Sequence, residues 1–320
     1  MTLTPEIIAI LMLDGLFLFF SSIAFVLSLK LYWYWDSDAT SLLQYRLEKE
    51  SYLVGLIIKY IFMLKVPLFL FFIYTCDTLS GIITGAMCAA GVVNSVDFGL
   101  FLLLFKLLNL YLFGFWLLLH VRDVESELQP YIRQKSLFFG IAFFFFVAEI
   151  VLEILFFTSL NISKIVSCCG TLFSASTQSS LSFLFLMENW MIVSFFYASF
   201  VLMLVGFMVK NSAVYLFSNL LFLFFAIVSL ILFFSTYVYE LPTHHCPFCL
   251  LQSDYYGVGY FLYATLFLGT FYGICGVVIS TLTQGFILRA MRLSIFFNSV
   301  YVLIVSAYVV VYFLKNGVWL

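Results

Sequence analysis

Residues 137–160 read LFFGIAFFFFVAEIVLEILFFTSL, an apolar run whose only charged residues are Glu149 and Glu153. A helix of about 20 apolar residues crosses the hydrocarbon core of a bilayer. The run is therefore long enough to span a membrane as one helix. Because residues four apart lie on the same side of a helix, Glu149 and Glu153 share one face. The sequence thus predicts a transmembrane helix with two carboxyl groups on one face.

The composition extends this interpretation to the whole chain. Of its 320 residues, 65% are hydrophobic and 9% are charged, and the mean hydropathy is +1.16. Too few polar side chains exist to cover a soluble core, which predicts an all-α polytopic membrane protein. We therefore expect the protein to lie in a lipid bilayer and to have no nucleic-acid partner. No fixed repeat or low-complexity linker divides the chain, so we expect one integral membrane domain over residues 1–320.

Eight spans are predicted, at roughly 5–29, 52–75, 98–119, 137–160, 189–209, 212–236, 256–284 and 295–314. The connections on one side carry nine lysines and arginines, namely Lys30, Arg46, Lys49, Arg122, Arg133, Lys135, Lys210, Arg289 and Arg292. The other side carries only Lys164 and Lys315. Basic connections stay in the cytoplasm, so both termini are predicted to lie outside.

Five charged residues fall inside the predicted spans at a common depth. At 1.5 Å per residue they lie roughly 10 to 17 Å below the outer surface. They are Asp14, Lys65, Lys106, Glu149 and Glu153. Charges in the bilayer are costly, so we expect them to face inward and to pair. Such a belt is either a proton path or polar pocket, or an ion-pair network that fixes the helix register.

Six of the seven cysteines are predicted at or near the outer face. They are Cys76, Cys88, Cys168, Cys169, Cys246 and Cys249, whereas Cys275 lies deep in a span. An outer, oxidising compartment allows disulfides. These cysteines are therefore either structural disulfides or thiols with a chemical role, and the pairing is open because the sequence alone does not fix connectivity.

The densest group of reactive side chains is His244-His245-Cys246-Pro247-Phe248-Cys249. A Cys-X-X-Cys brings two sulfurs within bridging reach, and a protonated histidine or a helix N-terminus lowers a thiol pKa. Proline fits the first turn of a helix, so the motif is predicted to open the seventh span with Cys246 exposed and Cys249 deeper. Disulfide exchange and soft-metal binding both use such groups.

The stretch Cys246–Gln252, reading CPFCLLQ, resembles the Cys-Pro-x-Cys-x-x-Gln of the bacterial disulfide bond formation protein B family. Ser253 stands where that family has an arginine. Vitamin K epoxide reductase relatives also place loop cysteines before their Cys-x-x-Cys. The resemblance implies a thiol oxidoreductase of the bacterial inner membrane, with a quinone as its cofactor and a soluble thioredoxin-like partner on the outer side.

Three functions follow from these features. In a membrane thiol-disulfide oxidoreductase, Cys246 and Cys249 form the redox pair, His245 lowers a thiol pKa, and Cys168 or Cys169 shuttles electrons. In a soft-metal binding or transport protein, the ligands for copper, zinc or mercury come from His244, His245, Cys246 and Cys249, with Cys168 and Cys169. In a non-catalytic membrane subunit, the cysteines form structural disulfides.

Overall fold

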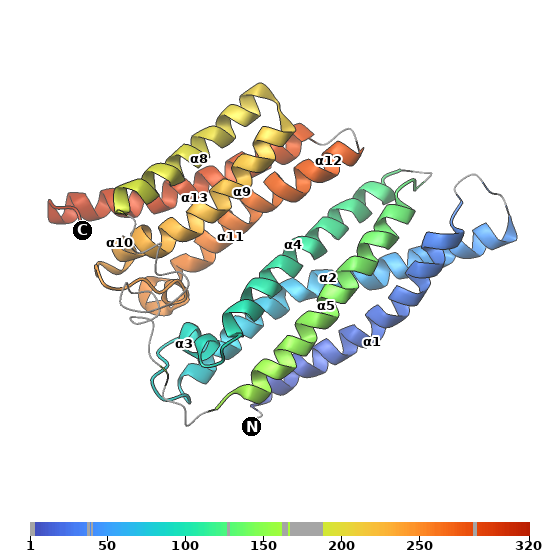
Figure 1. The fold of residues 1–320 in the computed structure, drawn as a ribbon, viewed down its shortest axis with the longest axis horizontal. Coiled ribbons are helices and arrows are strands. Elements are labelled where there is room, and N and C mark those ends of the chain that lie inside the picture. The colour runs from blue at the N-terminus through green and yellow to red at the C-terminus, as the bar shows by residue number, and fades with distance from the viewer. Residues whose placement is uncertain are drawn as a thin grey trace. The chain divides into compact units, whose positions relative to one another are not determined.

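The computed structural model describes residues 4–36, 39, 41–126, 129–161, 166, 188–283 and 287–320. All regular secondary structure in these ranges is helical (Figure 1). Eight helical stretches are long and apolar enough to cross a membrane: Pro5–Tyr34, Leu42–Ser80, Gly99–Val124, Ile132–Ser159, Asn189–Val209, Ser212–Tyr239, Val258–Leu282 and Leu288–Asn316. The chain is thus an all-α integral membrane protein, and the predicted number of spans is confirmed.

The second span begins earlier than predicted. Helix α2 runs without interruption over Leu42–Ser80, whereas the apolar pattern predicted a start near residue 52. The Ser41 side chain caps the helix by accepting a hydrogen bond from the Gln44 backbone N–H, at 3.2 Å. The polar residues that follow Ser41 therefore extend the membrane helix instead of forming a separate connector. Pro67 lies inside α2, as membrane helices tolerate.

The described residues form two compact units, and each is described by itself. Unit 1 comprises Met1–Ile83 and Val92–Lys164, and unit 2 comprises Thr84–Gly91 and Ile165–Leu320. In Figure 1 the long helices of unit 1 run from blue to green and those of unit 2 from yellow to red. A short helix, α3 (Ala89–Asn94), begins in the unit 2 segment and ends in unit 1.

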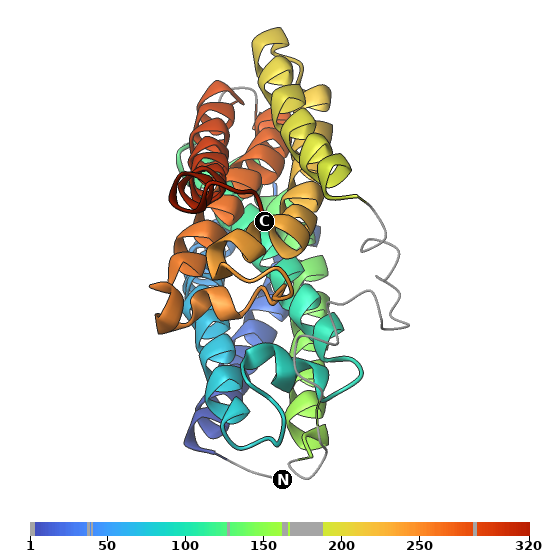
Figure 2. The ribbon, with the colours of Figure 1, turned by 90° about the vertical axis from the view of Figure 1, so that its left-hand side faces the viewer.

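Unit 1 is a bundle of four helices. Helix α1 (Pro5–Tyr34) packs on α2 and on α5 (Ile132–Ser159), and α4 (Gly99–Val124) packs on α5 and α2. The centre is aromatic, because the Phe62 ring stacks on Phe113 at 4.2 Å and meets Trp116 edge-on at 5.6 Å. Figures 1 and 2 show these helices running alongside one another.

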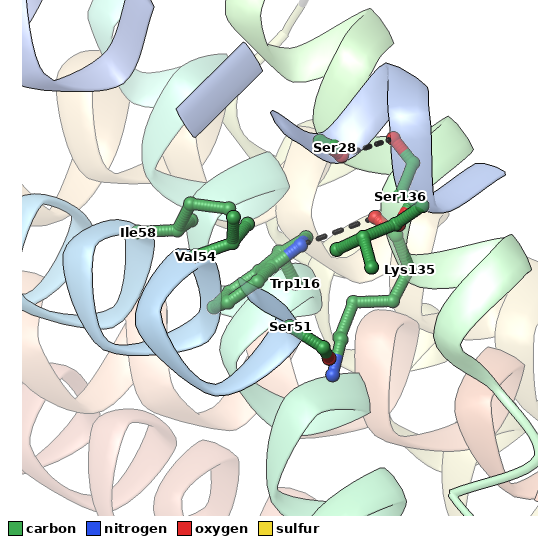
Figure 3. A pocket seen from close by; sticks show the side chains of 8 residues that line it. Ser28, Ser51, Val54, Ile58, Trp116, Lys135 and Ser136 are labelled. Atoms are coloured by element: carbon green, nitrogen blue, oxygen red, sulfur yellow. Dashed lines mark hydrogen bonds between the residues drawn. The ribbon is translucent and has the colours of Figure 1, made fainter. Parts of the chain in front are cut away.

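A small cavity lies between the helices of unit 1 (Figure 3). Its volume is about 10 Å³, and hydrogen bonds from Ser28 Oγ to Ser136 O and from Trp116 Nε1 to Lys135 O border it. A water molecule needs at least that much room. The cavity is therefore too small for a quinone or any other organic cofactor.

The described part of unit 2 has two helix pairs and two π-helical turns. Helix α8 (Asn189–Val209) packs on α9 (Ser212–Ser229), and α11 (Val258–Phe271) packs on α13 (Ile287–Asn316). The π-turn η1 (Leu230–Phe234) joins α9 to α10 (Ser235–Tyr239), and η4 (Tyr272–Gly276) joins α11 to α12 (Val277–Thr283).

Buried amides and hydroxyls join the helices of unit 2 within the spans. Asn219 Oδ1 accepts hydrogen bonds from Ser294 Oγ at 3.2 Å and from Asn298 Nδ2 at 3.3 Å. Gly273 lies against Asn219, where a Cβ atom would collide with the Asn219 side chain. Polar side chains and small residues are the usual means by which membrane helices pack closely.

The membrane topology can be tested with cysteines introduced at Ser126 and Thr243. The lysine and arginine asymmetry predicts Ser126 inside and Thr243 outside. Both would be introduced into a variant with Cys168 and Cys169 replaced by serine, since the other native cysteines are buried. An impermeant maleimide should label Thr243→Cys in intact cells and Ser126→Cys only after permeabilisation. The reverse pattern would contradict the proposed orientation.

Candidate functional site

Three cysteine sulfurs meet in unit 2. The Sγ atoms of Cys88, Cys246 and Cys249 all lie within 4.8 Å of one another. Cys88 Sγ and Cys246 Sγ are 3.6 Å apart, which is a non-bonded contact and not the ~2.05 Å of a disulfide. All three residues are thiols. We call these three residues the thiol cluster.

Two tyrosines and one glutamine hold the backbone around the thiol cluster. Tyr239 OH donates a hydrogen bond to the Cys246 carbonyl, and Tyr263 OH donates to the Pro247 carbonyl. Gln252 Nε2 donates to the Met87 carbonyl at 3.4 Å, next to Cys88. These bonds position the Cys-Pro-Phe-Cys segment, and the glutamine connects it to the loop that carries Cys88.

The motif does not open the seventh span, so that prediction was wrong. Cys249 begins a short 3-10 helix, Cys249–Leu251, and α11 begins only at Val258. Tyr256 and Gly257 have positive φ angles of 54° and 61°, which interrupt a helix between the motif and the span. The cysteines therefore precede α11 in the chain instead of forming its first turn, although Gly259 in that first turn packs on the backbone of Leu250.

The prediction that Cys246 is the exposed thiol was also wrong. Cys88 and Cys246 are 0% exposed and Cys249 is 6% exposed. They belong to an apolar core cluster that includes Phe234, Leu250 and Leu262. Reactive cysteines are usually partly exposed, so a soluble protein could reach these sulfurs only after a local opening.

The surroundings favour the neutral form of the thiols. Hydrogen bonds with the Cys246 and Cys88 thiols, together with burial, hold the pKa of Cys249 well above its usual range. Removal of water disfavours the charged form of any such group. The Cys249 thiol therefore holds its proton more firmly than an ordinary cysteine does.

The two histidines of the motif occupy different positions. His245 Nδ1 lies 3.1 Å from the Ile231 carbonyl of the π-turn η1, so this nitrogen carries the proton and donates it. His244 packs edge-on against Tyr239 with ring centroids 4.4 Å apart, and its buried Nε2 has no hydrogen-bond partner among the described residues. Burial lowers the pKa of both histidines, so both rings are neutral. A neutral His245 does not provide the positive charge expected to lower a thiol pKa.

The other cysteines are not members of the thiol cluster, or they lie outside the described residues. Cys76 is buried in α2 of unit 1, and Cys275 is buried in the π-turn η4. Cys168 and Cys169 lie outside the described residues. The contact of Cys88 with the motif was not predicted from the sequence. Its predicted position on the same outer face as the motif was the one available signal.

The five predicted intramembrane charges form one network in unit 1. Lys106 Nζ donates to Glu149 Oε1 at 3.0 Å and to Glu153 Oε2 at 2.6 Å. Lys65 Nζ donates to Asp14 Oδ1 at 2.9 Å and lies 3.0 Å from Glu149 Oε1. The expected pairing of lysines with these carboxyls is therefore present. We call these five residues and Asn109, described next, the charge network.

Asn109 completes the charge network, although it was not among the residues predicted from the sequence. Its Nδ2 donates to Glu149 Oε2 at 2.5 Å and to the Phe145 carbonyl at 3.2 Å. Asn109 lies three residues after Lys106 on α4, so the two side chains share a helix face. An amide at that spacing from a buried lysine was the signal that could have identified it.

The chain matches no known family, curated protein or solved structure in the three comparisons made. Its class, an integral membrane protein with eight membrane-spanning helices among the described residues, therefore follows from its own helices. The resemblance to disulfide bond formation protein B rests on Cys246–Gln252 alone.

The charge network should behave as a coupled unit in stability measurements. Lys106→Met leaves Glu149 and Glu153 without a shared partner, which should lower the free energy of unfolding by about 3–5 kcal/mol. Adding Glu149→Gln removes one of those charges, so the double variant should be less destabilised than the sum of the single variants. Thermal unfolding in detergent measures both effects.

The matched control is Lys30→Met, because Lys30 pairs with Glu50 through side chains that are 40% and 28% exposed. Its cost should be about 1 kcal/mol or less. Additive losses for Lys106→Met and Glu149→Gln, or an equal loss for Lys30→Met, would contradict the coupling.

Proposed function

We propose that this integral membrane protein binds a soft metal ion through Cys88, Cys246 and Cys249. The observation that carries the proposal is the convergence of three buried sulfurs within 4.8 Å of one another. Thiolates are the preferred protein ligands for copper(I), and zinc accepts them as well. A disulfide needs two sulfurs, whereas a metal centre gives a role to all three.

The spacing of the sulfurs fits a common metal ion. A zinc–sulfur bond is about 2.3 Å long, which separates thiolates by about 3.8 Å in a tetrahedral site and about 4.0 Å in a trigonal one. The measured contact is 3.6 Å between Cys88 and Cys246, and all three distances lie within 4.8 Å. Small side-chain rotations therefore suffice to form the site.

A bound metal ion would also supply the positive charge that thiolates need in this apolar site. The raised pKa of Cys249 means that thiolates are costly in this apolar site unless a cation is bound. Metal binding replaces the thiol protons, so the affinity rises with pH. His244 is not a member of the three-sulfur group, so it would become a fourth ligand only if its side chain moved to bring the unpartnered, buried Nε2 to the metal; that nitrogen has no hydrogen-bond partner among the described residues. His245 already uses Nδ1 for the Ile231 carbonyl.

The test is metal titration of the reduced, full-length protein in detergent. It should bind copper(I), or zinc as a second probe, in competition with a chelator. Replacing Cys88, Cys246 or Cys249 by serine should each lower the affinity about 100-fold or more, or about 2.7 kcal/mol. Cys275→Ser and Cys76→Ser are the matched controls, since both residues are buried cysteines outside the thiol cluster.

A Cys168→Ser/Cys169→Ser variant measures any binding by these two cysteines. A protein that binds no metal, or in which the control substitutions weaken binding as much as those in the thiol cluster, would contradict the metal site.

A second candidate function is thiol-disulfide exchange, and the contact between Cys88 and the Cys-Pro-Phe-Cys motif favours it. Cys246 can bond to Cys249 or to Cys88, so a thiolate on the third residue can attack the disulfide and release the other sulfur as a thiolate. Net oxidation of two thiols yields two electrons and two protons. A quinone accepts both and becomes a quinol, as the resemblance implies for a protein of the bacterial inner membrane. A thioredoxin-like partner would then supply the electrons.

Mass spectrometry after differential alkylation separates the two functions. Exchange predicts that a soluble quinone converts the thiols into a mixture of Cys246–Cys249 and Cys88–Cys246 disulfides, which a dithiol reductant reverses. In the same experiment Cys275→Ser should leave this mixture unchanged. Thiols that the quinone does not oxidise, but that bound metal protects from alkylation, would contradict exchange and support the metal site. Disulfides that resist mild reductant would instead support a structural role.

A further inference from the structure

We propose that the charge network in unit 1 is a proton-binding site, in which one proton is shared between the carboxyl groups of Asp14 and Glu153. The proposal is independent of the thiol cluster, because all residues of the charge network belong to unit 1. It rests on the number of charges, on two carboxyl oxygens without a donor, and on burial.

The number of charges leaves the site one proton short of neutrality. Three carboxylates, Asp14, Glu149 and Glu153, carry three negative charges, and Lys65 and Lys106 carry two positive ones. The sum, −3 + 2, is −1. A net charge buried in a bilayer is expensive, and a buried group that lacks a counter-charge becomes neutral by changing its protonation. One bound proton makes this group of five residues neutral.

The hydrogen bonds indicate where that proton belongs. Each carboxyl has two oxygens, and both oxygens of Glu149 are satisfied, Oε1 by the two lysines and Oε2 by Asn109. Asp14 uses Oδ1 for Lys65, and Glu153 uses Oε2 for Lys106. The remaining oxygens, Asp14 Oδ2 and Glu153 Oε1, are buried and have no hydrogen-bond partner among the residues that the structure describes.

The Asp14 and Glu153 side chains lie within hydrogen-bonding reach of each other. Two ionised carboxylates can only accept hydrogen bonds, so such a contact needs a proton between them. One proton there provides the missing donor and removes the excess charge together. A shared proton of this kind is typical of carboxyl pairs held close in a protein.

The surroundings leave little room for another donor. Asp14 and Glu153 are 1% and 0% exposed. The Lys106 ammonium lies 4.7 Å from the Phe72 ring centre, and the Lys65 ammonium 4.9 Å from that of Phe146. Titratable or charged groups lie around the pair on three packed helices: Lys65 and Cys76 on α2, Lys106 on α4, and Glu149 on α5. The Cys76 thiol is buried beside Glu153, whereas Asp77 is exposed.

A protonated carboxyl pair inside a membrane can exchange its proton with either side when the bundle opens. Intramembrane carboxyl groups are the elements of proton relays in pumps and transporters. The ligand of this site is therefore a proton, and the carboxyl groups of Asp14 and Glu153 hold it.

Infrared spectroscopy of the purified full-length protein tests the proposal. A protonated carboxylic acid has a carbonyl stretching band that ionised carboxylates lack and that shifts in D2O. Near neutral pH the protein should show one such band. Asp14→Asn and Glu153→Gln should each abolish it, because an amide N–H then provides the donor without a proton. Glu125→Gln, in the exposed pair with Arg122, is the matched control and should leave the band unchanged.

A second measurement needs no substitution and so does not depend on variants that fold. Carbon-13 labelling of aspartate or glutamate side chains should shift the band and assign the proton to these residue types. Absence of a deuterium-sensitive band, or its survival in both Asp14→Asn and Glu153→Gln, would overturn the proposal.

Discussion

The ion pairs of Lys106 with Glu149 and Glu153 are the constraint on which unit 1 depends. They connect α4 to α5, and Lys65 extends the same network to α1 and α2. Lipid offers no polar partner to a charge, so a helix that rotated or slid out of register would leave a charge unpaired in hydrocarbon. Apolar contacts alone tolerate such shifts, because lipid chains are as apolar as the side chains they replace. The charge network therefore specifies how the four helices meet.

The same low polarity decides the chemistry in unit 2. The three sulfurs lie in an apolar core that includes Phe234, Leu250 and Leu262. A neutral thiol needs no counter-charge in such a core, whereas a charged thiolate does. A redox pair that serves a soluble protein needs an exposed nucleophile, and none of the three cysteines provides one. A metal ion brings its own positive charge and uses all three sulfurs, which is why we favour it.

The two proposals use one physical argument in two places. In unit 1 the fixed charges sum to −1, so the site needs a proton. In unit 2 the proposed ligands are cysteines, and a bound cation would displace the thiol proton that Cys249 holds firmly. Each site is complete within its own unit as far as the structure describes the chain, and neither proposal depends on the arrangement of the two units.

The sequence by itself determined the membrane class, the eight spans and the pairing of the intramembrane charges. These follow from local composition and from the cost of a charge at a given depth. Tertiary structure alone decided that the Cys88 sulfur contacts the Cys246 sulfur, although the two residues are 158 positions apart in the chain, and that Cys246 is buried. It also decided that the Asp14 side chain lies near that of Glu153. It also placed the start of α11 beyond the motif, where Tyr256 and Gly257 take positive φ angles. Burial and contact between distant segments depend on how helices pack, and neither hydropathy nor motif spacing encodes that packing.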